Sequence, residues 1–237
     1  MTGTTGFVGS YVLKELLSHD QDIIVLKRSF SDLQRIEGCR GYRSYDLDHL
    51  SLEDIASKEP DIKTIVHIAT DYARNGNYLD LLRADLMLPL ELAQVFSKSL
   101  ESFINTTTYY TDFGLRYEYL KEYILTKRHL LDWFRLFSSD KKLRFINMKL
   151  FHIYGPMDSP EKFTARVVEQ LCKNVPQMEF TEGKQKRDFI YVEDVASAYW
   201  SVINNLQRIE KNFLIIDVGT GREYSLRHFI RTAQKIA

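Results

Sequence analysis

The sequence predicts an α/β protein in which helices cover both faces of a parallel, doubly wound β-sheet. Two observations predict this fold: strand-like apolar runs alternate with amphipathic stretches, and a glycine-rich turn leads directly into the first helix. The chain has 237 residues, which suits one such domain with at most a small subdomain. The expected strands are Ile23–Leu26, Thr64–Ile68, Phe103–Thr107, Phe145–Leu150 and Phe213–Asp217.

The helices are predicted by apolar residues that recur at the spacing of one helix face. Three groups show this spacing: Val12, Leu13, Leu16 and Leu17; Leu82, Leu86, Leu90 and Ala93; and Leu130, Leu131, Phe134 and Phe137. Pro89 is expected to kink the second of these helices, because proline has no backbone N–H to donate. A last helix is expected at Leu226–Ile236.

Composition and charge narrow the class of protein. Lys plus Arg and Asp plus Glu number 32 each, so no overall positive field attracts nucleic acid or an anionic membrane. No apolar run approaches the roughly 20 residues that span a bilayer, and no signal peptide is visible. Cys39 and Cys172 have no partners at metal-ligand spacing, so neither a disulfide framework nor a metal site is expected. These features favour a cytoplasmic protein that binds neither nucleic acid nor membrane.

The opening glycine turn carries the first chemical signal. Gly3, Gly6 and Gly9 have the spacing that lets a backbone approach a pyrophosphate and packs a helix closely on a sheet. The helix N-terminus then offers unpaired N–H groups to phosphate. The alternative is an ordinary glycine-rich turn that caps a helix. The residues expected to bind a dinucleotide are Gly3, Thr5, Gly6, Phe7, Val8 and Gly9.

The turn also sets the expected domain organisation. Residues 1–155 are expected to form a dinucleotide-binding core of the Rossmann type. Residues 156–237 are expected to form a small substrate-binding subdomain, interleaved with the last core strands. Because the turn begins at Thr2, the central strand before it is reduced to Met1 at most. A sequence trimmed at both ends, with unpaired sheet neighbours, is therefore expected.

The end of the next strand favours NADP over NAD. Lys27 and Arg28 lie about 20 residues beyond the turn, where a carboxylate would hold the ribose of NAD and a cation the 2′-phosphate of NADP. A solvated strand end is the alternative interpretation, and NAD stays possible. Asp46 and Leu47, after the following short strand, are expected at the adenine edge. Asp46 is equally well interpreted as a turn or helix-capping carboxylate.

A tyrosine and a lysine at helical spacing predict the catalytic pair. Tyr123 and Lys127 share a helix face, so the ammonium is expected to lower the pKa of the phenol and to hold the nicotinamide ribose. Thr108, at the end of the preceding strand, is expected to orient the substrate oxygen. Tyr117 and Lys121 have the same spacing, but a six-residue offset turns them to another face. The apolar periodicity that continues after Lys127 favours the later pair.

Together these residues resemble the extended short-chain dehydrogenase/reductase family, also called the NAD-dependent epimerase/dehydratase family. Further motifs carry the resemblance in order: VHIA at 66–69, KLFHIYGP at 149–156, GKQKRDFIYVEDV at 183–195 and DVGTG at 217–221. By this resemblance, Ile68 and Ala69 would pass the cofactor, and Arg187 would contact the nucleotide diphosphate of a nucleotide-sugar substrate. It also implies a homodimer built from the helices that carry Tyr123 and Leu86.

Departures from the family pattern narrow the implied activity. Thr108 is followed by two tyrosines rather than by Asp-Glu, which disfavours sugar dehydration. His152 stands where the family has asparagine, and either donates to a substrate hydroxyl or is a structural histidine. Lys149 replaces an arginine, and Asp85 stands where an asparagine is expected. The chain is most similar in these features to nucleotide-sugar 4-ketoreductases of the CDP-paratose and CDP-abequose synthase type.

The resemblance therefore implies NADP(H)-dependent reduction of a nucleotide-linked 4-keto-deoxysugar. A nucleotide-sugar 4-epimerase with bound NAD would use the same residues. A non-catalytic NADP-binding protein or an inactive fragment is the remaining alternative. The Tyr123–Lys127 pair disfavours it, because a protein that only binds the cofactor does not need this pair.

Overall fold

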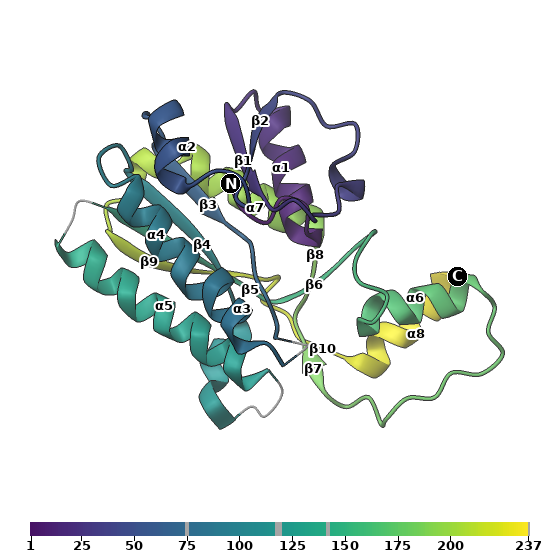
Figure 1. Cartoon of the computed structure of the whole chain (residues 1–237). Coiled ribbons are helices and arrows are strands. Elements are labelled where there is room, and N and C mark those ends of the chain that lie inside the picture. The colour runs from purple at the N-terminus through teal and green to yellow at the C-terminus, as the bar shows by residue number, and fades with distance from the viewer. Residues whose placement is uncertain (74–75, 117–119, 141–142, 237) are drawn as a thin grey trace.

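The main body of the protein is a parallel sheet between two layers of helices (Figure 1). The computed structural model describes residues 1–73, 76–116, 120–140 and 143–236. Its core strands are β1 (Ile23–Lys27), β2 (Tyr42–Asp46), β3 (Thr64–His67), β4 (Ser102–Thr108), β5 (Arg144–Leu150) and β9 (Phe213–Val218). β3, β4, β5 and β9 pair in that order, and β1 pairs with β2, all in parallel. Every strand predicted from the sequence is confirmed to within one residue at each end.

Met1 and Thr2 lie at the centre of this sheet, between β1 and β3. Thr2 forms parallel bridges to Leu26 of β1 and to His67 of β3. The backbone N–H of Leu26 donates to the Met1 carbonyl at 2.8 Å. Burial lowers the pKa of the Met1 amino group to about 5. The expected lack of pairing is therefore relieved only in part: Met1 and Thr2 bridge β1 and β3 near their carboxyl ends, while β1–β2 and β3–β4–β5–β9 are otherwise separate sheets.

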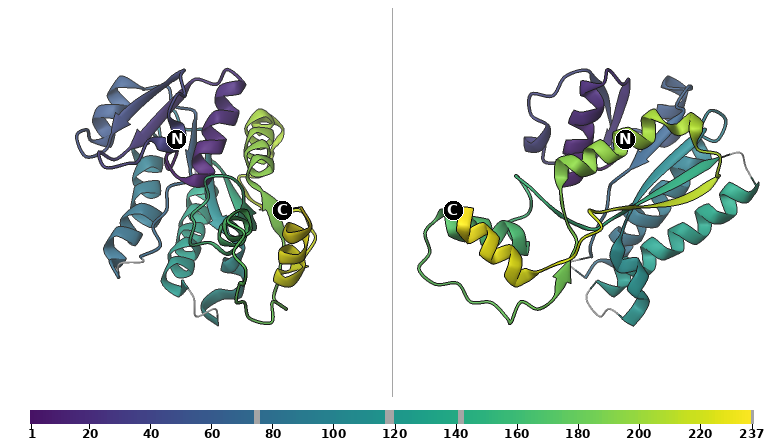
Figure 2. Two further views of the ribbon diagram at one scale, coloured as in Figure 1. Left: turned by 90° about the vertical axis from the view of Figure 1, so that its right-hand side faces the viewer. Right: turned by 180° about the vertical axis from the view of Figure 1, so that it is seen from behind.

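Helices on both faces make the sheet doubly wound (Figure 2). α1 (Phe7–Ser18) and α7 (Val192–Asn204) pack together on one face, and α2 (Leu52–Lys58), α4 (Leu88–Val95) and α5 (Lys121–Asp140) cover the other. Successive residues of a strand point to opposite faces. Ile104 accordingly lies in the core beneath α1 and α7, and Phe103 in the core beneath α5.

The helix expected around Leu82–Ala93 is not regular. It consists of α3 (Tyr78–Leu82), a π-helical turn η2 (Arg83–Met87) and α4, with Pro89 just inside α4. The interruption next to Pro89 agrees with the expected kink. Of the predicted residues, Ala93 is buried and Leu86 and Leu90 pack against the core, whereas Leu82 is exposed and its neighbour Leu81 is buried instead.

A smaller part of the chain lies beyond the carboxyl ends of the core strands (Figure 1). α6 (Phe163–Cys172) and α8 (Leu226–Ile236) pack side by side there, and α8 has the predicted bounds. Two short strand pairs connect them to the sheet: β6 (His152–Tyr154) with β8 (Phe189–Tyr191), and β7 (Lys186–Arg187) with β10 (Tyr224–Ser225). The described residues also include the 3₁₀ segments η1 (Gln34–Ile36), η3 (Tyr109–Arg116) and η4 (Leu206–Arg208). In the part of the chain that the structure describes, no helix is long and apolar enough to cross a membrane.

Candidate active site

The glycine turn packs against the end of β3 so closely that side chains are excluded. Gly3 has a φ of +72°, and a Cβ there would lie 2.4 Å from the backbone nitrogen of Ala69. A Cβ on Gly9 would lie 2.0 Å from the Gly3 carbonyl oxygen. Only glycine fits both positions without movement of the backbone. The turn residues and the predicted segment Ile68 and Ala69 are thus brought together.

The start of α1 is open to an anion. Gly6 caps the helix without a side-chain hydrogen bond, and its N–H donates to the Gly3 carbonyl at 3.0 Å. The N–H groups of the first turn, which includes Phe7 and Val8 after Thr5, have no partner within an α-helix. The ammonium of Lys162 lies 5.2 Å from the centre of the Phe7 ring. This glycine cradle at a helix N-terminus fits the diphosphate of a dinucleotide.

The basic residues at the end of β1 differ in their availability. Lys27 forms an ion pair with Asp46 at 3.2 Å, and the Ser29 hydroxyl donates to the same carboxylate oxygen at 2.9 Å. Arg28 is exposed, its guanidinium lies 4.4 Å from the centre of the Phe30 ring, and it has no ion pair within the described ranges. Leu47 donates its backbone N–H to the Lys27 carbonyl. Arg28 is therefore the more available cation for a 2′-phosphate, and Asp46 is engaged as the partner of Lys27.

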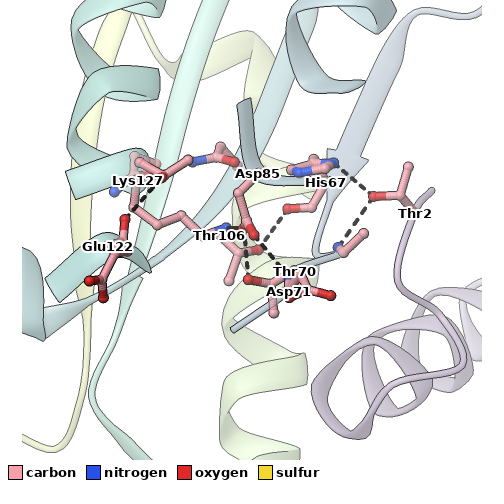
Figure 3. Close-up of polar contacts among 12 residues, drawn as sticks. Thr2, His67, Thr70, Asp71, Asp85, Thr106, Glu122 and Lys127 are labelled. Carbon is pink, nitrogen blue, oxygen red and sulfur yellow. Dashed lines mark hydrogen bonds and ion pairs between the residues drawn. The ribbon is translucent and has the colours of Figure 1, made fainter. Parts of the chain in front are cut away.

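Tyr123 and Lys127 lie together, as the sequence predicts. Their exposed fractions are 6% and 1%, and the Lys127 Nζ lies 5.6 Å from the centre of the Tyr123 ring. The ion-pair partner of Lys127 is Asp85 of η2, at 2.5 Å (Figure 3). The competing Tyr117 lies outside the described residues, so the structure does not compare the two pairs.

The pKa of Tyr123 is raised well above its usual value rather than lowered. Burial is the largest cause, followed by the nearby Tyr72 and by the negative charge of Asp85, while a hydrogen bond with Thr70 acts in the opposite direction. The expected lowering by Lys127 is therefore wrong for this arrangement, because Asp85 neutralises the ammonium and burial disfavours tyrosinate.

Two threonines near the strand ends have different partners. Thr108 ends β4, and its hydroxyl oxygen accepts the backbone N–H of Tyr110 at 3.3 Å. The hydroxyl that forms a hydrogen bond with Tyr123 is that of Thr70, just beyond β3. Sequence reasoning missed Thr70 as a partner of the tyrosine. The available signal was its position, since functional groups gather beyond the carboxyl ends of parallel strands.

Buried polar contacts fix the strand ends beneath this site. The His67 Nδ1 and the Thr2 hydroxyl are 2.9 Å apart (Figure 3). The Thr106 hydroxyl donates to the His67 carbonyl at 2.8 Å and lies 2.6 Å from the Tyr199 hydroxyl. Burial, followed by the charge of Lys127, lowers the pKa of His67 well below its usual value. His67 is therefore a neutral, structural group at neutral pH.

The two predicted substrate residues lie near each other on β6 and β7. Burial, with the positive charges of Arg187 and Lys162, lowers the pKa of His152 to about 4. His152 is consequently neutral at neutral pH and able to share a hydrogen bond with an uncharged hydroxyl. Lys149 is instead engaged in ion pairs with Asp112 at 2.8 Å and Asp217 at 2.9 Å.

Comparisons with known proteins identify the family. The model of the NAD dependent epimerase/dehydratase family matches residues 1–219. CDP-abequose synthase of Salmonella muenchen is 30% identical over 99% of this chain and 79% of its own length. Solved structures of similar fold include UDP-glucose 4-epimerase of Thermotoga maritima with UDP-glucose, at a TM-score of 0.80 and 22% identity over 99% of this chain and 81% of its own. Another is UDP-glucuronic acid 4-epimerase of Bacillus cereus with NAD. Its TM-score is 0.81 and its sequence identity 20%, over 99% of this chain and 81% of its own. The chain therefore belongs to the NAD dependent epimerase/dehydratase family.

Proposed function

We propose that this protein is a cytoplasmic NADP(H)-dependent reductase of a nucleotide-linked 4-keto-deoxysugar. The observation that carries the proposal is the buried Tyr123–Lys127 pair, which places a phenol, protonated at neutral pH, beside an ammonium. Reduction of a carbonyl requires a proton donor beside the developing alkoxide. The similarity to CDP-abequose synthase supports the choice of a nucleotide-linked deoxysugar.

Each residue of the site has a proposed role. The glycine turn with Ile68 and Ala69 would hold NADPH, which supplies a hydride to carbon 4 of the sugar when bound. Tyr123 donates its proton to the carbonyl oxygen, so the ketone becomes an alcohol and the tyrosine is left to be reprotonated from solvent. Lys127 would contact the nicotinamide ribose, and Thr108 would orient the carbonyl. His152 and Arg187, with the rest of the 156–237 portion, would bind the nucleotide sugar.

The proposal is tested by NADPH oxidation with a panel of CDP- and dTDP-linked 4-keto-deoxysugars. We expect turnover with at least one member, and a lower but measurable kcat/KM with NADH than with NADPH. A second candidate is a nucleotide-sugar 4-epimerase, favoured by the fold shared with solved 4-epimerases. Failure of every keto sugar, together with NAD retained through purification and interconversion of UDP-sugars, would establish the epimerase instead.

Cofactor choice is proposed to depend on Arg28. Arg28→Ala is expected to reduce kcat/KM for NADPH about 10- to 100-fold, because a charge-assisted hydrogen bond to a phosphate contributes about 1.5 to 3 kcal/mol. Turnover with NADH, which lacks the 2′-phosphate, should change little. Arg40→Ala removes another exposed cation and serves as the control. An equal loss with both cofactors would contradict the role of Arg28.

A homodimer is proposed from apolar side chains exposed on neighbouring helices. The most exposed of them on α3, η2 and α5 are Leu79 (64%), Leu136 (60%), Tyr78 (54%), Met87 (47%) and Trp133 (47%). Light scattering is expected to give twice the chain mass of 27.8 kDa, and Trp133→Glu is expected to lower it. A wild-type mass of one chain would remove the proposal.

A further inference from the structure

Tyr123 belongs to a small cluster of apolar and aromatic side chains. Its buried members are Leu81, Tyr123 and Ile124, and Tyr110 packs against them from η3. The ring of Tyr72, from the segment after β3, lies 4.9 Å from the ring of Tyr123, with an angle of 42° between the ring planes. Tyr72 is 39% exposed, whereas Tyr123 is 6% exposed. The ring of Tyr72, to which none of the roles above assigns a function, is therefore the aromatic surface that a ligand approaching Tyr123 can contact.

Hydrogen bonds hold the turn that carries Tyr72. One oxygen of the buried Asp85 carboxylate accepts the Thr70 hydroxyl at 2.7 Å, and the other accepts the backbone N–H of Asp71 at 2.8 Å (Figure 3). The Asp71 carboxylate accepts the backbone N–H of Ala73 at 2.6 Å, a local bond that stabilises tight turns. The residues on both sides of Tyr72 are thus fixed, and the structure holds its ring beside Tyr123.

The proposed reaction brings carbon 4 of the sugar to this place. For a proton to pass from Tyr123 to the carbonyl oxygen, the two oxygens must come within hydrogen-bond reach. The neighbours of carbon 4 are carbon 3 and carbon 5, and carbon 5 carries carbon 6. A side chain in contact with Tyr123, as Tyr72 is, therefore lies within reach of the substituents at carbon 3 or carbon 6.

The chemistry of an aromatic ring decides which substituents it accepts. A sugar hydroxyl pressed against a ring face loses hydrogen bonds with water and gains no equivalent partner, which costs free energy. A methylene or methyl group at the same place gains from leaving water. We propose that Tyr72 is a specificity-determining residue whose ring forms the apolar wall beside Tyr123 and contacts a deoxygenated carbon next to the carbonyl. This role deepens the proposed function and rests on it.

The test is the ratio of dissociation constants for nucleotide sugars that differ by one hydroxyl. CDP-glucose and dTDP-glucose are titrated calorimetrically beside their 3-deoxy and 6-deoxy forms, with NADP⁺ present. A closed hydrophobic pocket rejects one added hydroxyl about 100-fold, so a wall on one side should give about 10-fold tighter binding of one deoxy form. The preferred form shows which carbon faces Tyr72. Equal Kd values for the three forms in the wild type, or no binding of any of them, would overturn the proposal.

Two substitutions separate the ring of Tyr72 from its hydroxyl, which lies near enough to Tyr123 to raise the pKa of that phenol. Tyr72→Phe keeps the ring and should keep the preference, whereas Tyr72→Ser should bring the Kd values to within about twofold of each other. A preference lost in Tyr72→Phe would assign the effect to the hydroxyl, and one kept in Tyr72→Ser would remove Tyr72 from the contact. Either result overturns the proposal.

Tyr42→Ser is the matched control, because it makes the same change at a half-buried tyrosine that begins β2. Its ratio of Kd values should equal that of the wild type. Tyr72→Gln, a longer polar replacement, takes the place of Tyr72→Ser if the serine variant does not fold, and the same loss of preference is expected.

The binding ratio and the reductase assay can fail independently. A deoxy preference that depends on the Tyr72 ring supports this inference even if no keto sugar is reduced by NADPH. Reduction of a keto sugar without such a preference leaves the proposed function in place and overturns the role of Tyr72.

Discussion

Replacing Tyr123 with phenylalanine is expected to reduce kcat/KM for carbonyl reduction about 100- to 10,000-fold, the usual contribution of a positioned proton donor. The ring would stay, so the contact with Tyr72, whose ring centre is 4.9 Å away, and the burial beside Ile124 would be retained. Only the hydroxyl and its hydrogen bond with Thr70 are lost. NADPH binding should therefore change little, which fluorescence titration of the cofactor would measure alongside turnover.

Tyr117→Phe is the matched control for that experiment. Tyr117 and Lys121 repeat the spacing of Tyr123 and Lys127, so the sequence offers two candidate pairs. If Tyr123 is the proton donor, Tyr117→Phe should keep turnover within about twofold of wild type, since most changes away from the reacting atoms are small. A large loss in Tyr117→Phe, with Tyr123→Phe active, would assign the chemistry to the earlier pair.

The parts of the fold that the sequence predicts well are those governed by local rules. A β-strand and a glycine turn can each be identified from residues that are adjacent in the sequence. Thus β5 and β9 were predicted to within one residue, and Gly3 and Gly9 lie where no side chain fits. The Tyr123–Lys127 pair belongs to the same class, because a four-residue spacing fixes a shared helix face.

The electrostatics of the site depend on contacts that spacing does not encode. Helical periodicity grouped Leu82 with Leu86, but at the π-helical turn Leu82 is exposed, while Leu81 and Asp85 are buried. The partner of Lys127 is therefore 42 positions away on another element (127 − 85), beyond the reach of any local pattern. That contact, together with burial, reverses the expected direction of the Tyr123 pKa. The sequence can place such groups near the carboxyl ends of the strands. Which of them form ion pairs is seen only in the folded structure.

Lys127→Gln is expected to cause the largest loss of stability among these variants. Removing one member of a buried ion pair leaves the other charge unpaired, at a cost of about 3 to 5 kcal/mol. Asp85, at 0% exposed, would keep its hydrogen bonds from Thr70 and Asp71 but would lose its ion pair. For a chain of this size, that cost corresponds to a fall in melting temperature of about 6 to 20 °C.

Lys63→Gln provides the matched control, because Lys63 and Glu101 form an ion pair at 3.3 Å with side chains 59% and 55% exposed. Such surface pairs contribute at most about 1 kcal/mol, so its melting temperature should stay within about 4 °C of wild type. Calorimetry of the two variants thus compares the same substitution in a buried and in an exposed pair. Equal melting temperatures would mean that Lys127 is not bound to an ionised Asp85 in solution.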